Sequence, residues 1–435
     1  MTLSAPAQRA VPPDLEQGQA RIGQATLLFA VDHARAGHNF FIRLFDRHPE
    51  VLTVPHVSYL YDGLLNLAAG RPTLPAEAAL RYMMGTSNVS LLVSEPTPKI
   101  RAQFLRMGND PDAPLDRDLL RRVLRTLIGS RQEVTPAEVI RAVYLGYALA
   151  TGRPLHSVRY LLVSESVSSR RSILLTSVRR ESPPARVIHL VRDPRANFVS
   201  LRHQYVNQWG SMYPLERLLW GEGGCTWIWA LQTTAQGAQA VRAWKAGADP
   251  GQVLTVRNED LNLRFTETLR RITEWLGVGW FEGWSSPDYV PTSNGRPWLG
   301  ISAFSSAYQP FTRGPLPNDP PGQDRFFRPN REVTEQWKKR LLPREVAFLE
   351  ALYEEEMREM GYTFLHLTQG RSRFRALTKI LLPLAGELPP FHWYTRFASS
   401  VDLLRKLTYP LVLPPAYLLS RLWFLLLYAR GEFRR

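Results

Sequence analysis

The chain has 435 residues, of which 44% are hydrophobic and 11% aromatic, so it can build one large α/β domain or two smaller ones. Its net charge of +15 comes mostly from Arg and favours either an anionic partner or a compositional bias toward Arg. A single cysteine, Cys225, excludes an intrachain disulfide and a cysteine-based metal site, and it favours a reducing compartment.

The N-terminal residues predict a loose arm over residues 1–22, because they are polar and rich in Pro, Ala and Gln. Residues 1–23 contain no apolar core typical of a signal peptide and no anchor helix. A cytoplasmic location is therefore predicted.

A first phosphate-type loop follows this arm. Residues 25–31 predict a strand, residues 32–39 a turn that contains Gly37, and residues 40–47 a helix that ends before His48-Pro49. A strand, a glycine-containing loop and a helix in this order present backbone N–H groups to a phosphate.

Residues 57–157 predict a helical block, because they carry no strong strand signal. Within it, Thr135-Pro-Ala-Glu138 is a capping box that opens a helix. A helical block between strands favours a cap over an acceptor site. Beyond it, residues 158–164 predict a strand and residues 169–179 a helix.

A second phosphate-type segment lies at residues 186–203. Its apolar run, up to Val191, is typical of a buried parallel strand, and Asp193-Pro194 breaks it before a helix that starts near Ala196. Arg192 ends this strand and Ser200 lies eight residues later. A cation and a hydroxyl in these places can hold one phosphate together.

The remaining chain continues the alternation of strand and helix. Further elements are predicted as a helix over residues 225–246, a strand over 252–256, a helix over 265–276 closed by Gly277, a long loop over 280–330 and helices over 331–360. Strands that alternate with helices predict an α/β fold with an open parallel sheet flanked by helices.

Four separated segments resemble the sulfotransferase family, and their layout is most similar to the protein-tyrosine and carbohydrate branch. The segments are residues 31–51 with their His-Pro-acid-Val ending, Arg192-Asp-Pro-Arg-Ala with Ser200, Arg257-Asn-Glu-Asp-Leu261, and Phe327-Arg-Pro-Asn with Trp337 and Gly361-Tyr362. Together they span residues 22–370, in the family's order and spacing.

The resemblance implies a P-loop-like, three-layer catalytic domain over residues 23–370, with residues 57–157 as its helical insertion. It implies 3′-phosphoadenosine 5′-phosphosulfate as the donor substrate and a hydroxyl group as the acceptor. No metal and no nucleic acid are expected. Arg192 and Ser200 would hold the 3′-phosphate.

The first loop departs from the family's Arg-Ser-Gly-Thr-Thr pattern. Arg35 keeps the cation and Gly37 the tight backbone, whereas Ala36 removes one hydroxyl contact and His38 and Asn39 replace two others. Both replacements still offer hydrogen bonds to phosphate, and His38 can also carry charge. These five residues are predicted to bind the donor, and Arg35 also to meet charge that develops during transfer.

Three further residues take their predicted roles from the resemblance. A catalytic acid of the protein-tyrosine branch lies twenty-one residues after the loop's Arg, and His56 fills that position here, either as the predicted base or as a loop His on the surface. Glu165 takes the position of a Lys that lies near the transferring group in relatives. It is predicted to be either a catalytic residue or a strand-end acid paired with an Arg. Arg328 matches a donor contact. Glu259 and Asp260 favour a structural role.

Other site types find little support. The chain lacks the Gly-x-x-x-x-Gly-Lys-Ser/Thr pattern of ordinary P-loop nucleotidases, which makes a nucleotide kinase a poor alternative. Its nine His residues show no metal-ligand spacing.

The C-terminal tail, residues 371–435, carries eleven Lys and Arg against three acidic residues, a net charge of +8. Its apolar stretch at residues 411–428 is interrupted by Pro414-Pro415 and Arg421, which makes it a poor spanning helix. The tail predicts an element on an anionic membrane surface, on the cytoplasmic face. The alternative is a helical pair packed on the domain or on a second copy in a homodimer.

The predicted function is transfer of a sulfuryl group to a hydroxyl acceptor, with a saccharide, glycolipid or lipid preferred over a protein. The alternative is a degenerate relative that binds nucleotide, or acts as a membrane-associated scaffold, without turnover. Ala36, His38 and Glu165 favour this alternative.

Overall fold

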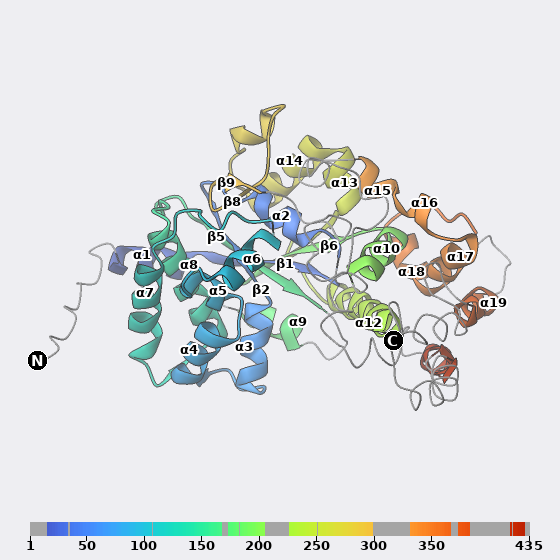
Figure 1. The fold of residues 1–435 in the computed structure, drawn as a ribbon, viewed down its shortest axis with the longest axis horizontal. Coiled ribbons are helices and arrows are strands. Elements are labelled where there is room, and N and C mark those ends of the chain that lie inside the picture. The colour runs from blue at the N-terminus through green and yellow to red at the C-terminus, as the bar shows by residue number, and fades with distance from the viewer. Residues whose placement is uncertain are drawn as a thin grey trace, which may run out of the picture.

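The computed structural model describes residues 15–33, 35–106, 108–167, 173–181, 183–204, 226–249, 251–298, 331–366, 373–382, 418–419 and 421–430. At its centre lies a sheet of five parallel strands (Figure 1), in the order β2-β5-β1-β6-β7. The strands are β1 (Thr26–Asp32), β2 (Val51–Ser58), β5 (Tyr160–Ser166), β6 (Arg186–Val191) and β7 (Val253–Arg257). The predicted open parallel sheet flanked by helices is confirmed.

The strands are apolar on both faces because helices cover both. In β1, Leu27 and Phe29 point into one core cluster, whereas Leu28 and Ala30 point into another. Side chains alternate along a strand, so a buried parallel strand reads as a continuous apolar run rather than an alternating one.

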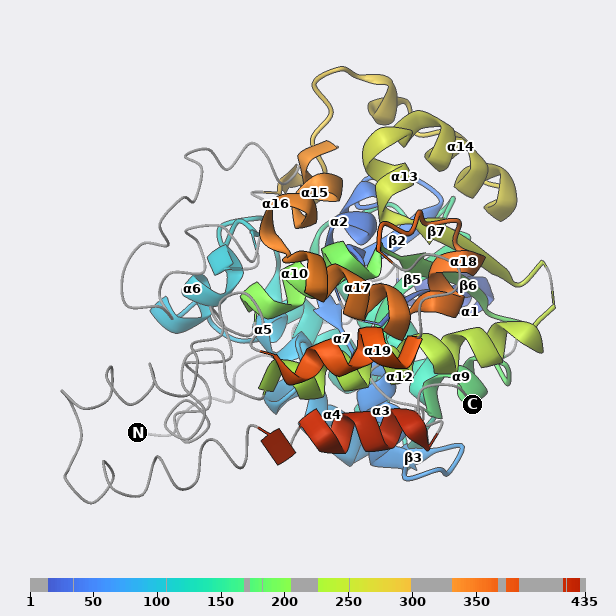
Figure 2. The same ribbon diagram turned by 90° about the vertical axis from the view of Figure 1, so that its right-hand side faces the viewer.

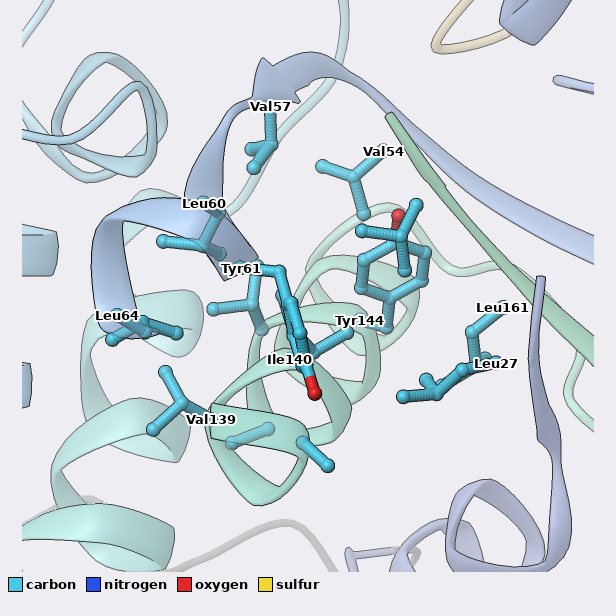
Figure 3. Packing of buried hydrophobic residues seen from close by; sticks show 14 of the residues in the cluster. Leu27, Val54, Val57, Leu60, Tyr61, Leu64, Val139, Ile140, Tyr144 and Leu161 are labelled. Carbon is cyan, nitrogen blue, oxygen red and sulfur yellow. The ribbon is translucent and has the colours of Figure 1, made fainter. Parts of the chain in front are cut away.

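The larger core joins the sheet to the helical insertion and to α12 (Thr226–Ala246). Figure 3 shows Leu27 and Leu161 of the sheet on the same side as Ile140 and Tyr144 of α8 (Pro136–Ala150). The hydroxyl of Tyr144 donates to the carbonyl of Leu162 at 2.5 Å, which satisfies a polar group inside this core.

The opposite face of the sheet is covered by three helices. They are α2 (His38–Leu44), α13 (Asn258–Leu263) and α14 (Phe265–Leu276). Helix α14 ends at Gly277, whose φ of 68° gives the left-handed turn that closes it, as its sequence predicts.

The helical insertion lies between β2 and β5. It comprises α3 (Leu60–Ala68), α4 (Ala76–Gly85), α5 (Val89–Val93), α6 (Pro98–Arg106), α7 (Arg117–Gly129) and α8. A short antiparallel pair, β3 (Leu74–Pro75) with β4 (Glu133–Val134), joins its two halves. The predicted capping box of Thr135 and Glu138 opens α8.

Strand β2 is not predicted from the sequence. It contains Pro55, which cannot donate to a sheet hydrogen bond, and this weakened the strand signal. Because β2 lies at the edge of the sheet and pairs only with β5, the missing donor is tolerated, and the register shifts between Thr53 and Ser58.

Over residues 15–22, the part of the predicted loose arm that the structure describes, the chain is helical instead. Residues Leu15–Gln24 form helix α1, with Leu15 and Ile22 buried. A Cβ on Gly18 would lie 2.7 Å from Leu145 Cδ1, so α1 packs closely against α8. Burial on α8 orders a segment whose local composition predicts a loose arm.

A separate core cluster joins α10 (Pro194–Gln204) and α12 to the C-terminal helices (Figure 2). These are α16 (Trp337–Arg340), α17 (Pro343–Leu352), α18 (Glu354–Glu359) and α19 (Arg373–Leu377), with a 3-10 turn at Thr378–Leu381; α15 (Arg331–Glu335) precedes them in the chain. Residues 421–429 form a further helix, and Phe424 packs on Phe348 of α17 with ring centroids 6.0 Å apart.

The strand order decides where a site forms. Strand β1 is central, with β5 on one side and β6 on the other. The chain that follows β1 continues to β2, which lies beyond β5. The loops that follow β1 and β6 therefore meet at the carboxyl edge of the sheet, on the two sides of a switch in strand order. Ligands of open α/β sheets bind in this crevice.

Candidate functional site

Two predicted donor-binding loops meet at this edge. Arg35, in the loop after β1, donates from Nε to Ser200 Oγ of α10 at 3.0 Å. Arg192, at the end of β6, donates from Nη1 to the carbonyl of Arg35 at 3.3 Å. The structure thus brings together three residues, Arg35, Arg192 and Ser200, from distant parts of the chain.

The Arg192 guanidinium is held by backbone carbonyls and has a buried nitrogen, Nε, that they do not use. Its Nη2 donates to the carbonyl of Val333 at 2.9 Å, whereas its buried Nε has no hydrogen-bond partner among the described residues. Burial lowers the pKa of Arg192, and nearby Arg35 lowers it further, against the opposing charge of Glu259. Two adjacent cations and an unpaired buried donor form a site that fits an anion.

Arg195, the second Arg of the Arg192-Asp-Pro-Arg motif, forms its ion pairs within the fold. Arg195 is buried and pairs with Asp193 at 2.7 Å and with Glu350 at 2.8 Å, and its guanidinium lies 4.1 Å from the Trp337 ring centroid. Its donors are therefore used within the fold. Of the two cations in this motif, Arg192 is the one available to a ligand.

The segment after β7 supports both loops. Glu259 accepts from the backbone N–H of Asp193 at 2.9 Å and from the hydroxyl of Tyr362 at 2.8 Å. The guanidinium of Arg257 lies over the Tyr362 ring at 4.6 Å. Glu259 thus connects the ends of β6 and β7 to the C-terminal segment, which is a structural role.

Gly37 is the tightest point of the first loop. Its φ is 97°, and a Cβ there would lie only 2.1 Å from Nδ2 of Asn258, which follows β7. Glycine is therefore required both by the backbone conformation and by the close approach of the Asn258 side chain. Arg35 is also left-handed, with a φ of 57°, so the loop turns sharply around its cation.

The inside of this loop holds a carboxylate. Asp32, at the end of β1, accepts from the backbone N–H of Ala36 at 3.3 Å and lies 2.8 Å from Nδ1 of His38. Asn39 accepts from Arg43, at 2.7 Å through its carbonyl and at 3.3 Å through its Oδ1. Of the predicted loop residues, Ala36 and His38 contact Asp32, and Asn39 contacts the next turn of its own helix.

Glu165 lies at the carboxyl end of β5 and faces helix α3. Its Oε1 accepts from the backbone N–H of Tyr61 at 2.7 Å, whereas its buried Oε2 has no partner among the described residues. Burial raises the pKa of Glu165 to about 8. The carboxyl group therefore caps α3 from another strand, since Tyr59, at the N-cap, provides no side-chain cap.

The structure does not describe the side chains of two predicted site residues. His56 is in the irregular part of β2, next to Pro55, whose carbonyl accepts from Arg43 at 3.0 Å, but its side chain is not among those described. Arg328 lies wholly outside the described residues.

Sequence reasoning missed three residues at this edge. Asp32 and Asn258 contact the first loop, and Tyr59 has a left-handed φ of 59° with its ring against His38, at a centroid distance of 6.2 Å. Asn258 and Tyr59 meet the loop only across long sequence separations, whereas Asp32 contacts Ala36 and His38, four and six residues later in the chain. A metal cluster is also absent: no group of three or more His, Cys, Asp or Glu in the described residues could hold an ion.

Comparisons with known proteins bear on the same region. Residues 171–282 match the model of a family described as "Sulfotransferase family". The chain finds no match among curated protein sequences. The matched residues contain β6, α10 and β7, and with them Arg192 and Ser200.

Solved structures offer similarities at low identity. The fold is similar to a sulfotransferase domain from the curacin biosynthetic pathway, with a TM-score of 0.46 and 11% identity over 78% of this chain and 99% of that chain. It is also similar to the sulfotransferase domain of the Synechococcus PCC 7002 olefin synthase, with a TM-score of 0.42 and 16% identity over 79% and 97% of the two chains. Sulfotransferase STF9 from Mycobacterium avium gives a TM-score of 0.33 and 10% identity over 81% and 80%.

The similarity to the family model is confined to residues 171–282. That match falls on the strand, turn and helix that carry Arg192 and Ser200. In this segment the chain is similar to the sulfotransferase family of enzymes.

Proposed function

We propose that the protein transfers a sulfuryl group from 3′-phosphoadenosine 5′-phosphosulfate to a hydroxyl acceptor. The observation that carries this proposal is the cluster of Arg35, Arg192 and Ser200 at the carboxyl edge of the sheet, with Arg192 Nε buried and unpaired among the described residues. Two cations and a hydroxyl there complement a nucleotide with phosphates at both ends.

Each residue of the cluster takes one task in this proposal. Arg192 and Ser200 hold the 3′-phosphate. Ser200 accepts from Arg35 Nε through Oγ, so its own hydroxyl hydrogen stays available to donate to a phosphate oxygen. Among described residues, Arg35 uses only Nε in a side-chain hydrogen bond, which leaves its other nitrogens for the reacting end of the donor.

In the reaction, the bond between sulfur and the bridging oxygen of the 5′-phosphate breaks while a bond between sulfur and the acceptor oxygen forms. Negative charge builds on the bridging oxygen, and a fixed cation such as Arg35 stabilises it. The acceptor's proton passes to a base, for which His56 remains the proposed residue. The adenosine 3′,5′-bisphosphate is released.

The contacts of Glu165 favour a structural role over a catalytic one. Its Oε1 is used by the N-terminus of α3, and its raised pKa keeps the carboxyl largely protonated at neutral pH. A protonated, buried acid is a poor base. Arg328 stays a proposed donor contact.

The donor assignment is tested with purified protein and adenosine 3′,5′-bisphosphate, followed by radiolabelled donor with a lipid and glycan extract. We expect the bisphosphate to bind and label to enter the lipid or glycan fraction. Binding without label transfer on a broad acceptor panel would favour the degenerate, non-catalytic relative. A protein that neither binds nor transfers would refute the proposal.

We further propose that the tail places the enzyme on an anionic membrane, with a saccharide, glycolipid or lipid as acceptor. The helix over residues 421–429 buries Phe424 and Tyr428 against the domain, whereas Leu418, Leu419, Leu422, Trp423 and Leu426 are exposed. No helix in the described part of the chain is long and apolar enough to cross a bilayer. An apolar helix face in a tail of net charge +8 fits an anionic membrane surface, proposed here as the cytoplasmic face.

Flotation with vesicles tests this placement. The wild-type protein should float with vesicles of phosphatidylcholine and phosphatidylserine, and Trp423→Glu should abolish flotation. Leu67→Glu is the control, because Leu67 is also an exposed large hydrophobic residue, 41% accessible, but lies on α3. Failure of the wild type to float, with a dimer in solution that Trp423→Glu dissociates, would assign the face to a second copy instead.

A further inference from the structure

A strained tyrosine stands where the donor loop meets the helical insertion. Tyr59 joins β2 to α3 with φ 59° and ψ 21°, a left-handed backbone that a bulky residue rarely adopts. Its ring lies against the ring of His38 in the donor loop, at a centroid distance of 6.2 Å. Backbone strain of this kind persists only where the surrounding structure holds it, and it concentrates at functional sites.

Main-chain hydrogen bonds fix Tyr59 on both sides. Its N–H donates to the Ser164 carbonyl of β5 at 3.0 Å, and its carbonyl accepts from the Gly63 N–H of α3 at 3.2 Å. The N-terminus of α3 is capped by the Glu165 carboxyl group, whereas the side chain of Tyr59 makes no capping bond. The backbone therefore holds Tyr59 in place, and its side chain has no task in starting the helix.

The Tyr59 hydroxyl has no hydrogen-bond partner among the described residues. Although 45% of the residue is exposed, burial of the hydroxyl is the main cause of the raised pKa of Tyr59. The charges of Asp32 and Glu165 also raise this pKa, and the Arg35 cation opposes them. The hydroxyl thus lies among charged groups at the carboxyl ends of β1 and β5. A hydroxyl withdrawn from water costs free energy until an acceptor pairs with it, and a ligand can supply that acceptor.

The strand order separates Tyr59 from the residues proposed to hold the 3′-phosphate. Arg192 and Ser200 lie on the β6 side of the loop that follows β1, whereas Tyr59 follows β2 and bonds to β5 on the other side. A nucleotide whose 3′-phosphate lies at Arg192 and that passes Arg35 therefore brings its 5′ end toward the β5 side. The helical insertion begins with α3 directly after Tyr59, so this residue lies between the donor loop and the predicted acceptor cap.

We propose that Tyr59 is a further catalytic residue, whose hydroxyl donates a hydrogen bond to an oxygen of the sulfuryl group during transfer. This rests on the proposed function. Tyr59 keeps its own proton throughout: the bond from sulfur to the bridging oxygen breaks, the bond from sulfur to the acceptor oxygen forms, and the acceptor's proton passes to the base. A hydroxyl that the fold already holds in place and shields from water needs little reorganisation to stabilise charge on the sulfuryl oxygens.

Tyr59→Phe removes only the hydroxyl, and two nucleotides that differ by the sulfuryl group isolate its contact. Calorimetry without acceptor should give an unchanged affinity for adenosine 3′,5′-bisphosphate. The affinity for 3′-phosphoadenosine 5′-phosphosulfate should fall about fivefold to tenfold, the value of one neutral hydrogen bond. Transfer of radiolabel to the lipid and glycan extract should fall about tenfold or more. The urea midpoint should not fall, because the variant loses no hydrogen bond to the described residues.

Tyr160→Phe is the matched control, since the buried Tyr160 hydroxyl donates to the Leu276 carbonyl at 2.7 Å. It should lower the urea midpoint and leave both affinities and the transfer of label unchanged. The inference is wrong if Tyr59→Phe binds the phosphosulfate as tightly as the wild type, weakens both nucleotides equally, or lowers the urea midpoint as Tyr160→Phe does. A wild-type protein that binds neither nucleotide would instead refute the donor assignment.

Discussion

Nε of Arg35 lies 3.0 Å from Oγ of Ser200, across 165 positions of the chain. The two predicted phosphate loops are therefore not independent: the cation of one is oriented by the hydroxyl of the other. An arginine fixed in this way loses less rotamer freedom when it meets a ligand.

Replacing Arg35 by Ala should lower turnover more than bisphosphate affinity. The charge that Arg35 meets develops only in the transition state, so we expect kcat to fall by about 10²- to 10³-fold, the usual effect of removing such a donor. Initial rates and calorimetric affinities measure the two effects separately. Ser130→Ala is the control, because the Ser130 hydroxyl donates to the Thr126 carbonyl at 2.8 Å, outside the candidate site. Equal losses in rate and affinity would contradict this division.

Replacing Arg192 should mainly lower ligand affinity, whereas replacing Arg195 should mainly lower stability. Arg192→Ala removes the donor with an unused Nε, so bisphosphate affinity should fall about tenfold to a hundredfold, with a smaller loss of stability than Arg195→Ala causes. Arg195→Ala leaves Asp193 and Glu350 without their buried cation and should cost about 3–5 kcal/mol of stability. Calorimetry and thermal melts distinguish the two; the reverse pattern would reassign the anion site.

The pH dependence of stability should reveal Glu165. Its folded-state pKa of about 8 lies above the ordinary 4.5, so the folded state binds the extra proton between these values and stability falls as pH rises through this window. Glu165→Gln still accepts the Tyr61 N–H but carries no charge. The variant should match the wild type near pH 5 and exceed it above pH 8, by up to a few kcal/mol, since one pKa unit is about 1.4 kcal/mol.

Urea unfolding at pH 5 and pH 8.5 measures this difference. Glu77→Gln is a suitable control, because its partner Arg81 is on the same exposed helix face. A constant stability difference between Glu165→Gln and the wild type at both pH values would contradict the raised pKa.

Gly37 and Asn258 should be energetically coupled. Gly37→Ala places a Cβ 2.1 Å from Asn258 Nδ2 at a φ of 97°, so it should destabilise the fold through both the clash and the backbone strain. In Gly37→Ala/Asn258→Ala the clash is gone and only the strain remains. The double variant should therefore lose less stability than the sum of the single variants, as a double-mutant cycle by urea unfolding would measure. Additive losses would contradict the contact.

Local chemistry in the sequence determines much of this protein. The apolar runs of β1, β5, β6 and β7 identify parallel strands, and Thr135 with Glu138, and Gly277, mark helix ends that the structure confirms. These features depend on a few neighbouring residues, so a short window contains them. A short window likewise predicts Arg192 at a strand end and Ser200 in the next helix.

Only the tertiary structure decides which of these residues meet. The strand order places the loops after β1 and β6 side by side, which pairs Arg35 with Ser200, and it directs Glu165 to the N-terminus of α3 rather than to an Arg. It also pairs Arg195 with Glu350 inside the fold, whereas the buried Nε of Arg192 has no partner among the described residues. Such contacts depend on sheet order and on side-chain direction across long separations, and no local propensity encodes either.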